Sequence, residues 1–412
     1  MFRSLYRREV GRITADIFEM NETERRVRED FHLSKFKDVE PVPDCLVLSM
    51  DVEMSEGRYL LSGSSAGALF IHDMRAQPAV PHTCKLLAVK NSCKPLSCVS
   101  WYPVDTGMFF SSSADGVFRI WDANRMKEVE RIHVSLGALF QHHSPLSEVH
   151  HNLVAVAGSA PEVKIVDTRT GSMCQELRRG HGLSQVTSCQ WSPRANCLLV
   201  TGGSDGSVTV WDVRSGKSRL GSIKRDSEKN AMKGRVQTLR FSSDGLNLVG
   251  YSECDDKIRV WDPLRFIPLE TIRVSKAKQH QRFRSSALAI VPSANDELLF
   301  YPSGKVINIS TMQSPTDDDA KSKTLSRLKM HFSDVTSLCF NPFENELYSA
   351  GGDSNVLVWS AYKHIIEDLN EGREERRLRE ENRGVRRQND PPVPSIVDDE
   401  FDLGEDAWSD DD

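Results

Sequence analysis

The sequence lacks several features that would place it in well-known protein classes. None of its nine cysteines forms a C-x-x-C pair, and the closest spacing, from Cys93 to Cys98, fits neither a zinc site nor a redox motif. No apolar run approaches the roughly 18 residues that a membrane span needs. The basic start, MFRSLYRREVGR, is not followed by the apolar stretch of a signal peptide. We therefore expect a soluble, intracellular protein whose cysteines are reduced and mostly buried.

The chain also lacks a charge excess of one sign. Its 412 residues hold 53 Lys and Arg against 59 Asp and Glu, so we do not expect a surface built to bind DNA directly. No glycine-rich phosphate loop is present, and the double histidines at 142–143 and 150–151 have no Cys or carboxylate at ligand spacing. We expect no cofactor, no metal site and no catalytic residue, and hence a protein that is not an enzyme.

What the chain does have is a repeat. The segment 185–212, QVTSCQWSPRANCLLVTGGSDGSVTVWD, reads as three short strands joined by tight turns and ends in Trp-Asp. Equivalent closing positions recur at intervals of 49, 45, 45, 50, 48 and 50 residues, at Asp73, Asp122, Asp167, Asp212, Asp262, Ser310 and Ser360. Such intervals are typical of four-stranded propeller blades. The sequence thus predicts an all-β fold, a seven-bladed β-propeller over residues 35–362. The first, third and sixth repeats are degenerate, since the closing Trp is replaced by His72, Val166 and Ile309.

Two repeats carry a polar set that resembles the WD-repeat family of propellers. In that family a His, a Ser or Thr, an Asp and a Trp form a buried hydrogen-bonded chain, so we expect a structural role rather than catalysis. The fourth repeat offers His181, Thr201, Asp205 and Trp211, and the seventh offers His331, Ser349, Asp353 and Trp359. Kelch-type blades are the alternative, because residues 202–203 and 351–352 are double glycines. The Trp-Asp endings favour WD repeats.

A closed ring requires a fourth strand for the last blade, and the residues after Ser360 do not supply one. The segment Lys35 to Val42, just ahead of the first repeat, is the candidate. We expect Asp38 to Pro41 to pair antiparallel with the third strand of the last blade.

Two segments lie outside the predicted ring. Residues 1–34 have apolar residues at helical spacing and predict a pair of short helices, the second capped by Thr14. Their apolar faces either pack on the propeller or bind another protein. Residues 363–412 predict a charged helix or linker followed by a disordered acidic tail, since residues 398–412 hold nine acids and no base.

Several segments together resemble the Cockayne syndrome group A family of WD-repeat substrate receptors. They are WYPVDTGMFFSSSADGVFRIWD (101–122), VWDVR (210–214), ERRV and KDVE near the start, and EDAWSDDD (405–412). The resemblance implies a nuclear, non-catalytic substrate-recognition subunit of a cullin-4-type RING E3 ubiquitin ligase, acting in transcription-coupled nucleotide excision repair. The implied partners are the ligase's damaged-DNA-binding adaptor, the repair ATPase of Cockayne syndrome group B, stalled RNA polymerase II and repair scaffold proteins.

The same resemblance assigns residues to adaptor binding. Receptors of this family use an Asp-x-Arg just past the closing Trp; Asp212 and Arg214 match it in full, Asp167 and Arg169 match without the Trp, and Asp73 with Arg75 matches more loosely. These arginines all begin the turn after a third strand and so belong on one face of the ring. The amino-terminal helix pair would be a further handle for the adaptor, through Leu5, Ile13 and Ile17.

Other interpretations of these residues stay open. From residue type alone, each Asp-x-Arg is a local clamp that holds its own turn. A direct reader of damaged DNA would need a basic patch with aromatic wedges on one face. A ligase-independent WD-repeat scaffold of a nuclear splicing or chromatin complex would keep the propeller without needing Arg214 or the helices.

Overall fold

The computed structural model describes much of the chain at the level of backbone and side chains. Two compact units are present, Met1–Ala361 and Tyr362–Asp412, and all described residues belong to the first. The predicted charged linker and acidic tail at 363–412 therefore lie outside the described residues. The described ranges are 14–29, 31–34, 37–39, 45–75, 82–91, 94–145, 152–215, 219–223, 232–252, 255, 257–265, 267–273, 288–291, 297–312 and 324–360.

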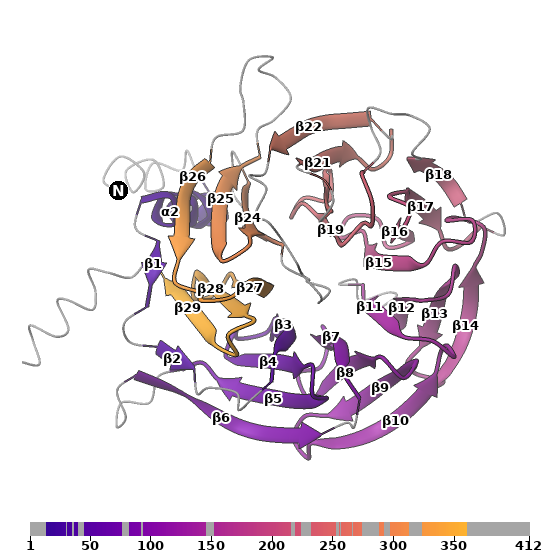
Figure 1. Ribbon diagram of the computed structural model, residues 1–412, viewed down its shortest axis with the longest axis horizontal. Coiled ribbons are helices and arrows are strands. Elements are labelled where there is room, and N and C mark those ends of the chain that lie inside the picture. Colours follow the sequence, from indigo (N-terminus) through magenta and orange to yellow (C-terminus); the bar gives the residue numbers. More distant parts are fainter. Residues whose placement is uncertain are drawn as a thin grey trace, which may run out of the picture. The chain divides into compact units, whose positions relative to one another are not determined.

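Seven sheets stand around a common centre, so the chain is a seven-bladed β-propeller as predicted (Figure 1). The innermost strands of blades 1 to 7 are β3 (Val47–Val52), β7 (Leu96–Trp101), β11 (Leu139–His143), β15 (Val186–Trp191), β19 (Thr238–Phe241), β23 (Ala289–Val291) and β27 (Val335–Asn341). The second strands are β4 (Tyr59–Ser64), β8 (Met108–Ser113), β12 (Leu153–Gly158), β16 (Leu198–Gly203), β20 (Leu248–Tyr251), β24 (Leu298–Ser303) and β28 (Glu346–Gly351).

The third strands end at the positions that the repeat had marked, except in blade 6, where β25 ends one residue later, at Thr311. They are β5 (Ala68–Asp73), β9 (Val117–Asp122), β13 (Val163–Asp167), β17 (Val208–Asp212), β21 (Lys257–Asp262), β25 (Val306–Thr311) and β29 (Val356–Ser360). Blades 1 to 6 have their own outer strands, β6 (His82–Asn91), β10 (Lys127–His133), β14 (Ser172–Leu177), β18 (Arg219–Ile223), β22 (Ile267–Arg273) and β26 (Thr324–Lys329).

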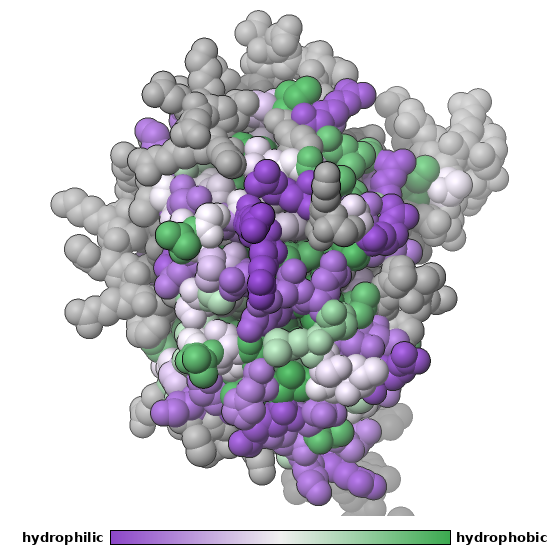
Figure 2. Space-filling view, turned by 90° about the vertical axis from the view of Figure 1, so that its right-hand side faces the viewer, coloured by the Kyte–Doolittle hydropathy of each residue, from purple (hydrophilic) through white to green (hydrophobic). Residues whose placement is uncertain are grey.

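The core is divided among the junctions between blades. Seven clusters of buried apolar side chains occur, one at each contact between neighbouring blades, including blade 7 with blade 1. Because both faces of a blade are covered, inner strands such as β5 and β15 are buried along their whole length. Outer strands such as β10 and β14 are mostly exposed. On the side of the ring that carries β14 and β18, hydrophilic surface dominates and hydrophobic patches are separate (Figure 2).

The ring closes through an amino-terminal strand, but not the one expected. The fourth strand of blade 7 is β1 (His32–Leu33), which pairs antiparallel with β29 and places Leu33 opposite Trp359. The predicted segment Asp38 to Pro41 contributes instead to β2 (Lys37–Val39), which pairs in parallel with β6 as a fifth strand of blade 1. The expectation about Asp38 to Pro41 was therefore wrong.

Packing explains why the earlier segment closes the ring. Phe31 and Leu33 both pack against the apolar cluster between blades 6 and 7, and the rings of Phe31 and Phe300 lie 5.5 Å apart. Beyond β1 the chain joins the junction between blades 7 and 1, where Val39 is buried and Lys37 Nζ lies 2.8 Å from Glu346 Oε1.

One helix is described, α2 (Ala15–Glu29), and Thr14 caps its amino terminus. The backbone N–H of Ile17 donates to Thr14 Oγ1 at 3.4 Å. Near the other end Val27 is fully buried in the cluster between blades 6 and 7, whereas Ile17 and Met20 are exposed. The helix thus packs on the propeller at its carboxyl end and leaves apolar side chains free near its start. Leu5, Ile13 and the first predicted helix lie outside the described residues.

Candidate functional site

The polar set of blade 4 forms a continuous hydrogen-bonded chain. Trp211 Nε1 donates to Thr201 Oγ1 at 2.8 Å, and that hydroxyl lies 2.7 Å from His181 Nε2. The other ring nitrogen lies 2.7 Å from Ser207 Oγ, which donates to Asp205 Oδ1 at 2.7 Å. Since the indole only donates and the carboxylate only accepts, the proton of His181 belongs on Nδ1. Ser207 thus connects His181 to Asp205. Sequence reasoning named Asp205 but missed Ser207.

Blade 7 contains the same chain without the relay. Trp359 Nε1 donates to Ser349 Oγ, and Ser349 Oγ lies 2.8 Å from His331 Nε2. His331 Nδ1 lies 3.2 Å from Asp353 Oδ2, so here the imidazole meets the carboxylate directly. The difference follows from the residue two positions after the Asp, which is Ser207 in blade 4 and Asn355 in blade 7.

Both imidazoles are held neutral. Burial lowers the pKa of His181 to about 4, and burial also lowers the pKa of His331 below its ordinary value. Gly180 packs directly against the Trp211 ring. A Cβ at this position would lie 2.3 Å from an indole carbon, so only a glycine fits beside the tryptophan. A hydroxyl that is fully buried and already accepts from an indole is not placed to attack a substrate. These chains are therefore arranged to hold the blade together.

In blade 2 an arginine pairs with the Asp of the tight turn between β8 and β9. Trp121 Nε1 donates to Ser111 Oγ at 2.8 Å, as in blade 4. The guanidinium of Arg119, on β9, donates to Asp115 Oδ2 at 2.5 Å and also bonds Ser113. The Arg119 side chain is buried, so it occupies the role that the imidazole has in blades 4 and 7.

Blade 5 uses the same solution. Arg259, on β21 two residues before Trp261, forms a buried ion pair with Asp255, whose side chain is 0% exposed. The backbone N–H of Lys233 also donates to Asp255 Oδ2, at 3.1 Å. Sequence reasoning did not single out either arginine, although both stand two residues before a closing Trp.

The full Asp-x-Arg match lies at the turn after β17 and is exposed. Asp212 Oδ1 accepts from the backbone N–H of Arg214 at 3.1 Å, and the guanidinium donates to both carboxylate oxygens. These bonds from Arg214 lower the pKa of Asp212. The side chain of Arg214 is 70% exposed, and this clamp uses only part of its five N–H donors.

The two looser matches differ from the first. Asp167 Oδ1 accepts from the backbone N–H of Arg169 at 2.9 Å, while the exposed Arg169 guanidinium has no partner among the described residues. In blade 1 the carboxylate of Asp73 pairs with Arg58, whose Nη2 donates to it at 2.6 Å. The guanidinium of Arg75 lies instead 3.4 Å from Glu56.

Two further arginines occupy the same kind of turn, one position later. The backbone N–H of Arg125 donates to Asp122 Oδ1, and that of Arg265 donates to Asp262 Oδ1. Their side chains are 81% and 79% exposed. A search for Asp-x-Arg misses them because the arginine stands three residues after the Asp, not two. We call the surface formed by the turns after the third strands the arginine face, after its exposed arginines Arg75, Arg125, Arg169, Arg214 and Arg265.

The centre of the ring is lined by polar side chains that link one blade to the next. A cavity of about 290 Å³ is bordered by residues from all seven innermost strands. Side chains on the innermost strand of one blade accept hydrogen bonds from backbone N–H groups of the next blade. One of these side chains is Asp51, and burial raises its pKa to about 6. The pairs are Asp51 with Trp101, Gln141 with Cys189, His143 with Trp191, and Gln190 with Phe241.

The double histidine of β11 belongs to this lining and holds no metal-type cluster. His142 lies between the hydroxyls of Ser100 and Ser112, at 2.9 and 2.7 Å, and burial lowers its pKa to about 3. Within the described ranges, no group of three or more His, Cys, Asp or Glu side chains is close enough together to form a metal site. Six cysteines have described side chains and are free; three of them are buried and Cys174 is exposed. The described part of the chain has no helix long and apolar enough to span a membrane.

Comparisons with known proteins agree with this architecture. The model of the WD domain, G-beta repeat, matches residues 84–122, 172–212, 228–262 and 322–360. These matches end at the third strands of blades 2, 4, 5 and 7, the four that close with a Trp. The three degenerate repeats predicted from the sequence are the three that the model does not match.

Several curated proteins are similar over long stretches. WD repeat-containing protein ATCSA-1 of Arabidopsis thaliana is 26% identical over 87% of this chain and 95% of its own length. Radiation-sensitive protein 28 of Saccharomyces cerevisiae is 26% identical over 32% of this chain and 27% of its own length. Eukaryotic translation initiation factor 3 subunit I of Nematostella vectensis is 22% identical over 64% of this chain and 79% of its own length. Four of the seven blades thus carry the WD40 repeat, in a ring of seven sheets that each have four or five strands.

Proposed function

We propose that this protein is the substrate-recognition subunit of a cullin-4-type RING E3 ubiquitin ligase that acts in transcription-coupled nucleotide excision repair in the nucleus. Its role is non-catalytic, since ubiquitin transfer takes place on the RING module and the receptor supplies proximity. The observation that carries the proposal is the placement of Arg169 and Arg214 on one exposed face, each held by its own Asp. The similarity to ATCSA-1, which extends over most of both chains, supports it.

The arginine face suits an adaptor with a carboxylate-rich surface. Each of these turns is fixed by a bond from the backbone N–H of the arginine to an Asp. The guanidinium of Arg214 is also held by its Asp and keeps N–H donors left over for a partner. The exposed start of α2, with Ile17 and Met20, offers an apolar surface as a second handle. In the assembled ligase the opposite face would meet the repair ATPase of Cockayne syndrome group B, stalled RNA polymerase II or repair scaffold proteins.

Co-purification of the adaptor from cells tests this proposal. Arg214→Ala, combined with deletion of residues 1–20, is expected to abolish capture of the damaged-DNA-binding adaptor. The deletion keeps the packed Val27 end of α2, and exposed ion pairs contribute little to stability, so the melting temperature should stay near wild type. The matched control is Arg178→Ala, an exposed, ion-paired arginine on the opposite face. Adaptor capture that survives the first variant would refute the proposal.

A ligase-independent scaffold is the second candidate. Subunit I of a translation initiation factor is similar over 64% of this chain, at an identity of 22% against 26% for ATCSA-1. A scaffold of a nuclear splicing or chromatin complex would need the propeller but not Arg214. It predicts that the same variant leaves every co-purified protein unchanged.

A further inference from the structure

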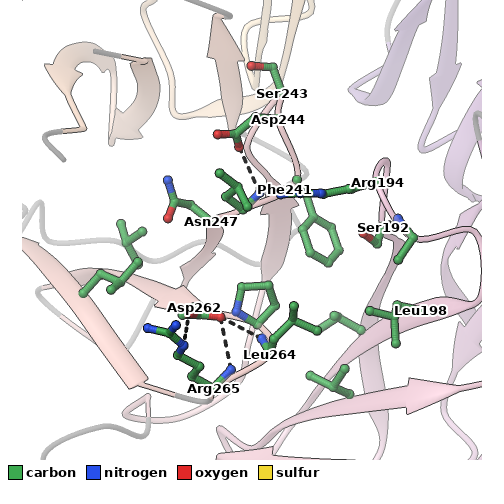
Figure 3. A pocket seen from close by; sticks show the side chains of 18 of the residues that line it. Ser192, Arg194, Leu198, Phe241, Ser243, Asp244, Asn247, Asp262, Leu264 and Arg265 are labelled. Atoms are coloured by element: carbon green, nitrogen blue, oxygen red, sulfur yellow. Dashed lines mark hydrogen bonds and ion pairs between the residues drawn. The ribbon is translucent and has the colours of Figure 1, made fainter. Parts of the chain in front are cut away.

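A cavity of about 610 Å³ opens on the arginine face beside blade 5 and has no role in the function proposed above. Its walls are the first turns of blades 4 and 5 and the turn after β21. Figure 3 shows Ser243, Asp244 and Asn247 on one side of the cavity, Asp262, Leu264 and Arg265 on the other, and Phe241 between them. The cavity therefore lies at the contacts of blade 5 with blades 4 and 6, not in the central channel.

The interior of the cavity is apolar and its mouth exposes two leucines. Leu198, Phe241 and Met312 line it from blades 4, 5 and 6. At the mouth, Leu246 is 49% exposed and Leu264 is 63% exposed. An exposed apolar lining of this kind is stabilised by a hydrocarbon group that removes it from water.

The charge in the cavity is uneven. Asp262 accepts from the backbone N–H groups of Leu264 and Arg265, at 2.9 and 3.1 Å. The guanidinium of Arg265 also lies 3.7 Å from this carboxylate, so the two charges balance on this side of the cavity. On the opposite side stand two carboxylates, Asp244 and Glu297. Arg194 is the other base of the lining, so three acids face two bases.

The two carboxylates of this acidic side act on each other. Glu297 Oε1 accepts from the backbone N–H and the hydroxyl of Ser243, at 2.8 and 2.5 Å. Burial raises the pKa of Glu297, and the nearby charge of Asp244 raises it further. Asp244 is exposed, and only its Oδ1 is used within the described residues, by Ser242 and Leu246. A cation placed against Asp244 would relieve the repulsion between the two groups.

We propose that this cavity binds a basic side chain of a partner protein, a lysine or arginine flanked by aliphatic residues. The hydrocarbon stem lies on Phe241 and the two leucines at the mouth, and the cationic end lies against Asp244 with the Glu297 charge behind it. On a face that otherwise exposes arginines, this is the place that accepts a base. A partner with an acidic surface and one projecting basic side chain would thereby be held in a single register.

Methyl NMR with defined peptides tests the proposal without any ligase component, so its failure is separate from failure of the proposed function. The probes are acetyl-Gly-Leu-Arg-Leu-Gly-amide and the matched peptide with Gln in place of Arg. We expect saturable shifts of the Met312, Leu246 and Leu264 methyl signals, with the Arg peptide binding about tenfold more tightly than the Gln peptide because of its charge-assisted contact.

Variants of the cavity separate charge from apolar contact. Asp244→Asn and Glu297→Gln should each reduce the preference for Arg over Gln by several-fold, whereas Leu246→Ala should weaken both peptides equally. Glu162→Gln, in a turn on the opposite face, is the control and should change neither. Equal binding of the two peptides, an Arg preference unchanged in Asp244→Asn, or no saturable shift at these methyl groups would each overturn the proposal.

Discussion

Blades 4 and 7 link the carboxylate of their second tight turn to an imidazole, through Ser207 in blade 4 and directly in blade 7. Blades 2 and 5 pair that carboxylate with a guanidinium instead. In the first pair, His181 and His331 come from the turn that enters the blade, so the hydrogen-bonded chain ties the blade to the segment before it. In the second pair, Arg119 and Arg259 come from the blade's own third strand. The comparison teaches that the Asp at this turn requires a hydrogen-bond donor, and that the fold accepts either a neutral chain or an ion pair.

The largest expected effect is in the ion-paired blades. Arg259→Leu leaves the fully buried Asp255 without its counter-charge, and we expect a loss of about 3–5 kcal/mol in the free energy of unfolding. Urea unfolding monitored by tryptophan fluorescence measures it. Adding Asp255→Asn removes the stranded charge and should recover most of the loss. A cost below about 1 kcal/mol for Arg259→Leu alone would mean that the pair is not needed in this blade.

A smaller effect is expected in the imidazole blades. His181→Leu leaves Thr201 and Ser207 each short of one hydrogen bond, but strands no charge that was paired directly. We expect a loss of about 1–3 kcal/mol in the same unfolding experiment. The comparison between the two kinds of blade fails if His181→Leu proves more costly than Arg259→Leu.

The repeat could be predicted from sequence because its marks are local. Tight turns and the closing Trp-Asp lie within a few residues of the strands that they delimit, so Asp122, Asp212 and Asp262 predicted the ends of β9, β17 and β21 correctly. The closing strand could not be predicted in the same way. Whether His32 or Asp38 pairs with β29 depends on contacts of Phe31 and Leu33 with residues some 270 to 330 positions away.

The candidate site was foreseen only in part, and for the same reason. Sequence reasoning brought His181, Thr201 and Trp211 together, because the spacing of the repeat aligns them. It missed Ser207, since a serine in a turn has no distinctive pattern. It also missed Arg119 and Arg259, because a charged residue in a strand is ordinarily assigned to the solvent side, and only packing reveals that these two are buried.

The smallest expected effect distinguishes the two kinds of blade by pH. The pKa of His181 is about 4 in the folded protein and about 6.5 when unfolded, so the unfolded chain takes up the proton first and stability falls as the pH drops below 6.5. Between pH 7.5 and 5.5 this group should account for about 1 kcal/mol of lost stability.

Urea unfolding at the two pH values isolates the contribution of His181. In His181→Leu the loss between pH 7.5 and 5.5 should be smaller than in wild type by that amount. The double variant Arg259→Leu with Asp255→Asn should keep the wild-type loss, because it retains His181 and leaves no stranded carboxylate to titrate in this range. A pH dependence that is the same in His181→Leu and wild type would show that this imidazole is not held neutral by burial.

The short pair between β1 and β29 also orders events during synthesis. Residues 32–33 leave the ribosome before any blade exists, yet their partners, residues 359–360, are made last. Each of blades 1 to 6 can form as its own hairpins emerge, but blade 7 stays open until translation has passed Ser360. A message truncated within the codons of β29 therefore leaves β1 and β28 with bare strand edges, a product prone to pair with other chains and a natural target for quality control.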